Sequence, residues 1–265
     1  MKLLLMGAGY VGMAFINEIK HSHEIYITTT TRSRVESLKP YAKEVFDLNH
    51  ESNQSFDEFV NQCDGAVILV APSNSRNYEE TYLQTAKKLF TALSKRTTPF
   101  YMIYTSSTSV YEGQKSEWVS EEMELSLESI NAKILLETEK CFLNCNACIC
   151  ILRLAGIFGP KRELNNRATK LSGKEMAGSG DEPTNHIHLD DILSAITFCL
   201  KNKITGIYNL VNEDHPTRES LYSNLCNQMK IPPPIWNMDK SQSVKGYKVS
   251  NQKIKHAGFA FQHGI

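Results

Sequence analysis

Three glycines near the start of the chain have the spacing of a phosphate-binding turn. The residues from Gly7 to Gly12 read GAGYVG, which fits the pattern G-x-G-x-x-G. The pattern is weak alone, but here it follows an apolar run and opens a segment with helical periodicity. Gly7 would permit the tight turn, Gly9 the close approach of a pyrophosphate, and Gly12 the packing of helix against strand. The N–H groups and positive dipole at the start of that helix would then face the phosphates.

The end of the next apolar run indicates which dinucleotide would bind. An NAD site usually carries Asp or Glu about 20 residues after the glycines, where the acid binds the ribose 2′-hydroxyl. Here the run ends in Thr30, Thr31 and Arg32, without an acid. Because arginine and small hydroxyls can hold a 2′-phosphate, the sequence favours NADP, with NAD as the alternative. Two other interpretations stay open: a glycine turn without a ligand, and Arg32 and Arg34 as solvated loop charges.

Short apolar runs alternate with longer amphipathic segments, and these elements would position the turn. Strands are predicted at 2–7, 24–30, 43–48, 65–73, 99–108, 147–159 and 207–211, and helices at 11–19, 77–95 and 129–143. Such alternation is typical of a mostly parallel sheet that binds ligands beyond the carboxyl ends of its strands. The predicted fold class is α/β, a Rossmann-type doubly wound parallel sheet with a small C-terminal substrate lobe. We expect residues 1–155 to form an NAD(P)-binding domain, and residues 156–265 to complete the sheet and form the lobe.

The composition argues against several kinds of partner. Lys plus Arg and Asp plus Glu number 29 each among 265 residues, so the formal net charge is zero. That balance predicts no nucleic-acid partner and no anionic membrane partner. No apolar run approaches the roughly 20 residues that cross a bilayer. The seven cysteines are an odd number, which suits free thiols and a cytoplasmic protein.

Two clusters of potential metal ligands or acids have simpler interpretations. Cys145 and Cys148 have C-x₂-C spacing, but no second pair follows, and Cys148 and Cys150 fall in a predicted buried strand. We therefore expect no metal site. Asp190 and Asp191 are adjacent, and adjacent residues on a helix point about 100° apart. We expect Asp190 to cap the helix that begins there.

Seven stretches, in order along the chain, resemble a known family. They are GAGYVG (7–12), Asp47-Leu48, Val70-Ala71-Pro72, YTSSTSVYE (104–112), LRLAGIFGP (152–160), HIHLDDILSAI (186–196) and GIYNLVN (206–212). Together they resemble the short-chain dehydrogenase/reductase superfamily, in its extended and atypical branch of NAD(P)-dependent epimerase/dehydratase-like and nucleoside-diphosphate-sugar epimerase-like proteins. The resemblance covers essentially the whole chain. It implies an oxidoreductase or epimerase that acts on a nucleotide sugar or a related small molecule.

In that family a Ser or Thr, a Tyr and a Lys carry the chemistry. The resemblance implies Ser107 as the group that hydrogen-bonds the reacting oxygen, and Lys133 as the group that binds the nicotinamide ribose and lowers the pKa of the tyrosine. The tyrosine would stand four residues before Lys133, on the same helix face, but that position is Ser129. A serine hydroxyl is a far weaker acid than a phenol and is shorter by a ring. Tyr111, from the loop of Ser107, is the substitute we retain as a catalytic candidate.

The glycine turn and the resemblance together imply a set of cofactor contacts. They are Gly7, Gly9, Tyr10, Val11, Gly12, Thr31, Arg32, Asp47, Leu48, Ala71, Pro72 and Lys133. Two histidines, His186 and His188, are further candidates for a catalytic acid, although HIHL alternates as a strand does and would pack one ring and expose the other.

The substrate and the class of function stay open. Nucleotide-sugar enzymes of this type often carry an arginine where this chain has Thr184. One hypothesis is an NADP-dependent reductase, epimerase or dehydratase with altered chemistry. The other is a protein that binds NADP(H) without hydride transfer and serves as a sensor or binds a partner. The resemblance also implies a homodimer through the helices that contain residues 82–90 and 129–137.

Overall fold

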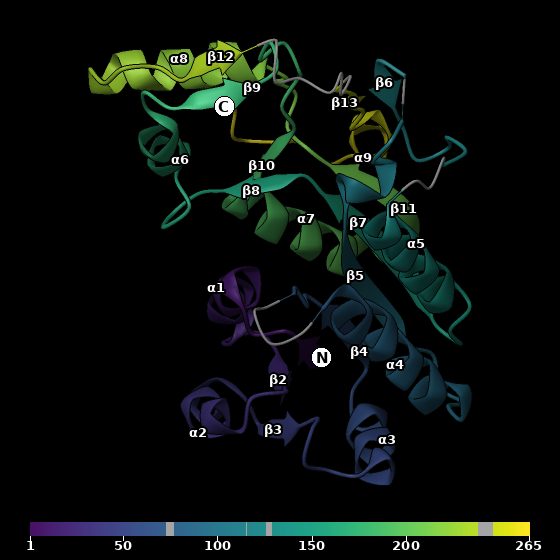
Figure 1. Cartoon of the computed structure of the whole chain (residues 1–265). Helices are drawn as coiled ribbons and strands as arrows, with labels where there is room; N and C mark the ends of the chain where they lie inside the picture. The colour runs from purple at the N-terminus through teal and green to yellow at the C-terminus, as the bar shows by residue number, and fades with distance from the viewer. Residues whose placement is uncertain (73–76, 115, 126–128, 238–245) are drawn as a thin grey trace. The chain divides into compact units, whose positions relative to one another are not determined.

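A seven-stranded sheet with the strand order β11-β7-β5-β4-β1-β2-β3 is the centre of the computed structural model (Figure 1). The structure describes residues 1–72, 77–114, 116–125, 129–237 and 246–265. The strands of this sheet are β1 (Lys2–Met6), β2 (Glu24–Thr29), β3 (Glu44–Asp47), β4 (Gly65–Ile68), β5 (Tyr101–Ser107), β7 (Cys148–Leu154) and β11 (Gly206–Leu210). Strand β1 pairs in parallel with β2 and β4, and so do β2 with β3 and β4 with β5. The predicted α/β class is therefore confirmed.

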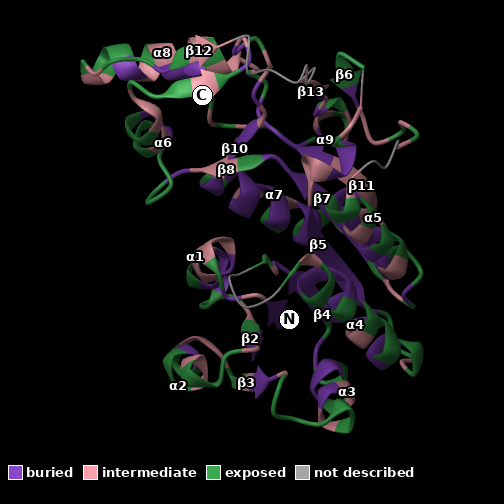
Figure 2. Cartoon of the chain, in the orientation of Figure 1, coloured by how far each residue is buried: buried purple, intermediate pink, exposed green. Residues whose placement is uncertain are grey.

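Helices alternate with these strands along the chain. They are α1 (Tyr10–Ile19), α2 (Val35–Leu38), α3 (Asn53–Asn61), α4 (Gln84–Ser94), α5 (Ile130–Leu143) and α7 (Leu189–Asn202). A π-helical segment, Glu79–Leu83, leads into α4. The strands are apolar because helices cover both faces of a parallel sheet. In Figure 2, β4 and β5 are accordingly almost entirely buried.

The stretch predicted as one strand at 147–159 is two strands. Strand β7 ends at Leu154, and β8 (Gly156–Phe158) pairs in parallel with β10 (His186–His188). The Gly156 N–H donates to Asn185 O at 3.0 Å. A Cβ at Gly156 would lie only 3.1 Å from that same oxygen, so the glycine permits the change of partner. The prediction of one continuous strand was wrong because the pairing partner lies far along the chain.

The chain forms two compact units. Unit 1 comprises Met1–Val110, Leu127–Arg153 and Leu193–Ile207; unit 2 comprises Tyr111–Ser126, Leu154–Ile192 and Tyr208–Ile265. Besides β8 and β10, the elements of unit 2 include β6 (Trp118–Val119), β9 (Glu175–Ala177), β12 (Ile235–Asn237), β13 (Lys248–Val249), α6 (Leu164–Leu171), α8 (Arg218–Met229) and α9 (Gln252–His256). Strand β12 pairs with β9, and β13 with β6, both in parallel.

Each unit has its own apolar core. In unit 1 the side chains of Leu3, Leu4 and Leu5 are fully buried. In unit 2, helices α6 and α8 pack together through Ala168 and Cys226. Within the described residues, none of the helices is both long and apolar enough to span a bilayer.

Candidate cofactor and active site

The glycine turn after β1 has a geometric reason for each of its three glycines. Gly7 has a φ of 104°, and a Cβ there would lie 2.5 Å from Leu69 O. A Cβ at Gly12 would lie 1.9 Å from Gly7 O, so α1 approaches the turn only without a side chain. At Gly9, by contrast, a Cβ would meet no protein atom within 4 Å. The protein packing therefore explains Gly7 and Gly12 but leaves open space above Gly9, where a pyrophosphate would approach.

The start of α1 suits an anion. Helix α1 begins at Tyr10, and its N-cap is Gly9, which has no side chain to accept a hydrogen bond from the first turn. No acidic residue lies in that first turn. The positive end of the helix dipole is thus not offset by a carboxylate. This arrangement fits the phosphates of a dinucleotide.

The loop after β2 places its two arginines in different surroundings. Thr31 and Arg32 are exposed. The Arg34 side chain instead donates from Nη2 to Ala8 O at 2.8 Å, which joins this loop to the glycine turn. Arg34 therefore has a structural contact, and Arg32 is the arginine left with an exposed side chain. The sequence carried no signal for this difference, because the two residues stand two positions apart in the same loop.

Asp47, at the end of β3, is an ionised group held in place by its neighbours. The residue is buried, with 6% of its side chain exposed. Burial alone would raise the pKa of Asp47, but hydrogen bonds from His50 and the Asn49 N–H, with the charges of His50 and Arg32, lower the pKa below its ordinary value. The next residue, Leu48, donates its N–H to Thr29 O at 2.8 Å, so the loops after β2 and β3 lie together.

The predicted cofactor residues of unit 1 gather at one edge of the sheet. Strands β1 to β5 are parallel, so their carboxyl ends share that edge. Gly7 follows β1, Thr31 follows β2, Asp47 ends β3, Ala71 follows β4 and Ser107 ends β5. Pro72, next to Ala71, is exposed like Ala71 itself. The sheet thus assembles five loops from distant parts of the sequence into one surface.

Ser107 and Lys133 come from two neighbouring elements of unit 1. Ser107 is half-buried; its hydroxyl donates to Ser109 Oγ and accepts from the Ser109 N–H, each at 3.1 Å. Lys133 is exposed in the first turns of α5. The chain after α5 enters β7, whose first N–H, of Cys148, donates to Phe100 O just before β5. Helix α5 therefore begins at the carboxyl edge of the sheet, the edge at which Ser107 lies.

Ser129 is the N-cap of α5 and not a residue within the helix. Its backbone is extended (φ −86°, ψ 139°), and its Oγ accepts from the Ala132 N–H at 3.4 Å. The prediction that the helix begins at Ser129 was therefore wrong by one residue. That difference matters, because the Ser129 hydroxyl accepts a hydrogen bond from the first turn of its own helix. Serine is a favoured capping residue, which is the signal that sequence reasoning overlooked.

A buried polar network joins the elements that carry Ser107 and Lys133. Arg153 on β7 forms two hydrogen bonds with Glu139 on α5, from Nε to Oε1 at 3.0 Å and from Nη2 to Oε2 at 2.7 Å. Ser106 on β5 donates to the same Oε1 at 2.6 Å. The Arg153 and Glu139 side chains are 3% and 1% exposed. This paired geometry fixes α5 against β5 and β7, and no spacing in the sequence indicated it.

Tyr111 belongs to unit 2 and is fully buried. Its hydroxyl donates to Asn209 Oδ1 at 2.8 Å, and its ring contacts that of Tyr247 edge-on with centroids 6.3 Å apart. Such contacts hold a phenol in place through packing and hydrogen bonding. Tyr111 stays a prediction as a catalytic group.

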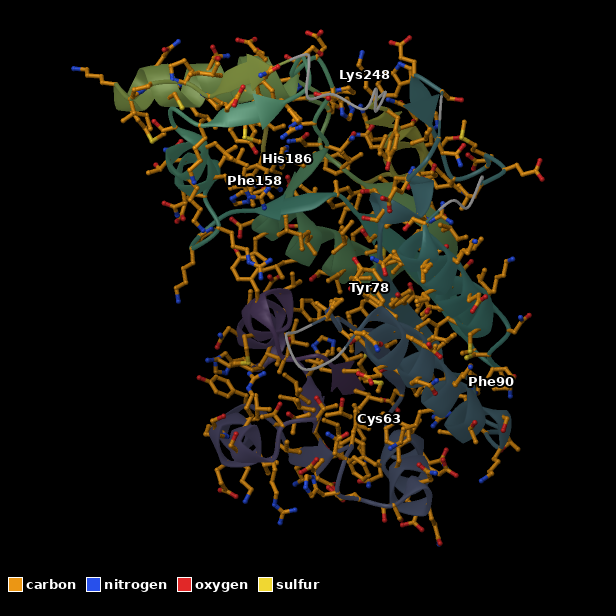
Figure 3. The ribbon with its side chains drawn as sticks, viewed as in Figure 1. Cys63, Tyr78, Phe90, Phe158, His186 and Lys248 are labelled. Carbon is orange, nitrogen blue, oxygen red and sulfur yellow. The ribbon has the colours of Figure 1, made fainter. Side chains whose placement is uncertain are left out.

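Of the two histidines of β10, His186 is packed as predicted, whereas the prediction of an exposed ring at His188 was wrong, because only 15% of that side chain is exposed. His186 is 5% exposed and lies edge-on to Phe158 (Figure 3). Burial and then the charge of Arg167 lower the pKa of His186 to about 4, so the ring is neutral near pH 7. His188 is half-buried. Thr184, at the position of the expected arginine, is buried and donates its hydroxyl to Pro216 O at 2.9 Å.

The prediction that Asp190 caps α7 was wrong. His188 Nδ1 accepts from the Asp190 N–H at 3.2 Å, so the histidine before the helix caps it. Asp190 is exposed, and Asp191 is fully buried and accepts from the N–H groups of Gln262 and His263. The seven cysteines are free thiols, and Cys150 Sγ lies 3.7 Å from Cys199 Sγ in the core. Cys148, predicted to be buried, is instead exposed as the first residue of β7.

Comparison with known proteins agrees with this architecture. Protein YeeZ of Escherichia coli (strain K12) is 28% identical over 270 residues, which cover 99% of this chain and 96% of that protein. A conserved protein of unknown function from Silicibacter pomeroyi DSS has a TM-score of 0.78 at 18% identity, over 99% of this chain and 94% of that one. A UDP-glucuronic acid 4-epimerase from Bacillus cereus, solved with UDP-glucuronic acid and NAD, has a TM-score of 0.76 at 19% identity, over 97% of this chain and 92% of the epimerase.

These structural similarities show a common fold. A sequence model of one protein family also identifies the family, because it matches residues 3–210, well over half of the chain. The matched region runs from β1 to β11 and so includes the glycine turn, Ser107 and Lys133. The chain belongs to the NAD dependent epimerase/dehydratase family.

Proposed function

We propose that the protein binds NADP and acts as a reductase, epimerase or dehydratase on a nucleotide sugar or a related small molecule. The observation that carries the proposal is the glycine turn. Gly7 and Gly12 are required by the protein's own packing, whereas Gly9 opens onto free space at the start of α1. A glycine that no protein atom requires is explained by a ligand that approaches the backbone there.

The proposed contacts follow the carboxyl edge of the sheet. The backbone of Gly9, Tyr10 and Val11 would hold the pyrophosphate, because the start of α1 offers N–H groups and a positive dipole. Thr31 and Arg32 would hold the 2′-phosphate, since both are exposed in the loop after β2. The loops of Asp47-Leu48 and Ala71-Pro72 would enclose the adenosine half. The bound dinucleotide would supply a hydride acceptor or donor.

Ser107 and Lys133 are the proposed active-site pair. Ser107 would hydrogen-bond the reacting oxygen of the substrate, and Lys133 would bind the nicotinamide ribose. Their elements are held together by the buried contacts among Ser106, Glu139 and Arg153, which supports a fixed spacing between them. The proton would come from a group other than Ser129, whose hydroxyl caps α5.

A second function is favoured by the same capping serine. The position that would carry a phenol instead binds the Ala132 N–H, so the usual acid is missing and its place has a structural use. A protein that binds NADP(H) without hydride transfer, as a sensor or as the partner of another protein, is consistent with that arrangement. Cofactor binding is common to both functions, and turnover separates them.

The proposal also covers the class of substrate, the oligomeric state and the location of the protein. The Bacillus cereus epimerase was solved with a nucleotide sugar and NAD, which supports that class of substrate here and keeps NAD as the alternative cofactor. Helices α4 and α5 expose the apolar residues Phe90, Ile130 and Leu143 (38%, 74% and 44% exposed), which supports a homodimer through these helices. Seven free thiols support a cytoplasmic location.

Two measurements test the proposal. NADPH and NADH are first titrated against the protein by cofactor fluorescence, and failure of both to bind would refute both functions. A panel of nucleotide sugars is then added, and oxidation or reduction of the bound cofactor is followed by absorbance. An enzyme is expected to lose turnover in Ser107→Ala and Lys133→Ala but to keep it in Ser129→Ala. Lys140→Ala, an exposed lysine further along α5, is the matched control for Lys133→Ala.

Tight NADPH binding without turnover on any sugar would favour the sensor. The oligomeric state is measured separately by sedimentation. Ile130→Lys is expected to convert the proposed dimer to a monomer, because it places a charge on the most exposed apolar side chain of α5.

A further inference from the structure

Two histidines and two aspartates of unit 2 converge at the start of α7. His188 ends β10, Asp190 and Asp191 lie in the first turn of α7, and His263 lies in the segment after α9. Asp190 Oδ2 is 3.6 Å from His188 Nδ1 and 3.8 Å from His263 Nε2. One ligand atom from each of these three residues lies within 4.8 Å of the other two. This is the one group among the described residues in which three potential metal ligands come together.

Asp191 gives the cluster a supporting carboxylate. It is fully buried, and its two oxygens accept from the N–H groups of Gln262 and His263 at 2.9 and 3.2 Å. Its Oδ1 also lies 3.3 Å from His263 Nδ1. This contact lacks the geometry of a hydrogen bond in the structure. A small rotation of the ring that completed it would favour the tautomer with its proton on Nδ1 and leave Nε2 free to bind a metal. The His263 Nε2 atom is the one that faces Asp190.

We propose that His188, Asp190 and His263 form a binding site for a divalent transition-metal ion of the zinc type. Neutral imidazole and carboxylate are ligands that zinc prefers, and three protein ligands leave a fourth position for water or another small ligand. With bonds of about 2.0–2.1 Å, tetrahedral ligands stand about 3.3–3.4 Å apart. The two separations from Asp190, 3.6 and 3.8 Å, need to close by only a few tenths of an ångström, whereas the two imidazole nitrogens, which lie within 4.8 Å of each other, need a larger movement.

Binding requires one further movement. The His188 and His263 rings are stacked, with centroids 4.0 Å apart and planes 21° from parallel. The lone pairs of an imidazole lie in its ring plane, so two stacked rings cannot both point at one ion. One ring has to turn, and His188 has to release the Asp190 N–H that it caps. His263 is the ring with room to turn, because its side chain is 35% exposed, against 15% for that of His188.

The consequence would be a fixed attachment of the segment around His263 to the start of α7. Two hydrogen bonds to Asp191 and the stacking of the two rings already join that segment to α7 and β10. A metal ion would add two bonds to α7 and β10 and one to the segment. The site involves none of the residues proposed to hold the dinucleotide, so it stands or fails independently of the proposed function.

The test uses the full chain, first stripped with a chelator and then titrated with Zn²⁺ and Co²⁺ by calorimetry. We expect one ion per chain and a rise in Tm of about 5–10 °C at a hundredfold excess over Kd. The Co²⁺ complex should show the visible absorption of a four-coordinate site without the near-ultraviolet band that a thiolate ligand adds. That spectrum separates this site from the seven cysteines.

Substitution of each proposed ligand, and of the supporting Asp191, identifies the residues that hold the metal ion. His263→Ala, His188→Ala and Asp190→Asn should each weaken binding at least tenfold, and Asp191→Asn about 10- to 100-fold. His256→Ala, an exposed histidine on α9, is the matched control and should bind as the wild type does. Asp190 is exposed, so Asp190→Asn keeps the assignment testable where a histidine variant fails to fold. Absence of saturable binding to the wild-type chain, or binding unchanged in Asp190→Asn and His263→Ala, would overturn the proposal.

Discussion

Gly9→Ala separates the role of the glycine turn in folding from its role in binding. A Cβ at Gly9 would meet no protein atom within 4 Å, and its backbone is extended (φ −84°, ψ −150°). Alanine adopts such a conformation, and it reduces the entropy of the unfolded chain relative to glycine. We therefore expect the free energy of unfolding to stay within about 1 kcal/mol of the wild type.

The methyl group that Gly9→Ala adds should weaken cofactor binding strongly. It would fill the space through which a pyrophosphate approaches the start of α1 and would push the phosphates away from the backbone N–H groups. Loss of one hydrogen bond to a charged group costs about 1.5–3 kcal/mol. Since about 1.4 kcal/mol is a factor of ten in Kd, the affinity for NADPH should fall by about 10- to 150-fold.

The assay is NADPH titration by fluorescence, with the free energy of unfolding measured in urea on the same samples. Gly12→Ala is the matched control, because its Cβ would lie 1.9 Å from Gly7 O and should destabilise the fold itself. A Gly9→Ala protein that is stable and binds NADPH as tightly as the wild type would refute the placement of the phosphates above this turn.

Three further substitutions test other parts of the structure. Arg32→Ser should weaken NADPH binding about tenfold or more and leave NADH binding nearly unchanged, because only NADPH carries the 2′-phosphate; equal losses for both would contradict the assignment. Glu139→Gln should lower the free energy of unfolding by about 3–5 kcal/mol, since it removes the carboxylate paired with buried Arg153, and Glu139→Leu combined with Arg153→Met should recover most of it in urea unfolding. Burial lowers the pKa of His186 from 6.5 to about 4, so the stability it contributes is complete above about pH 6.5 and is lost as the pH falls toward 4. The free energy of unfolding should fall by about 3 kcal/mol over that window, and His186→Gln should flatten the profile; an unchanged slope would argue against His186 as its cause.

The repeating apolar runs predicted the seven strands of the sheet and their alternation with helices along the chain, because parallel strands covered on both faces must be apolar throughout. The glycine turn could be predicted equally well, since the spacing of Gly7 and Gly12 reflects a local contact in which a Cβ at Gly12 would meet Gly7 O. The predicted family was confirmed for the same reason: its motifs are the turns and strand ends of that sheet.

Features that depend on contacts between residues far apart in the sequence could not be predicted. The predicted strand from residue 147 divides because β8 pairs with β10, far along the chain, where Gly156 is opposite His186. Glu139 and Arg153 come from an amphipathic helix and an apolar strand, and nothing in their spacing indicated that the two charges are buried together. The convergence of His188 and His263 depends on how the segment after α9 returns to α7, which no local pattern encodes.

The cap at Ser129 has a consequence for any attempt to place a tyrosine there. Replacing Ser129 by tyrosine would remove the hydroxyl that caps the first turn of α5. The phenol would stand before the helix and not on the helix face that carries Lys133. A phenol placed four residues before Lys133 would therefore also change how α5 begins, so such a substitution would alter the stability of the helix as well as the chemistry of the position.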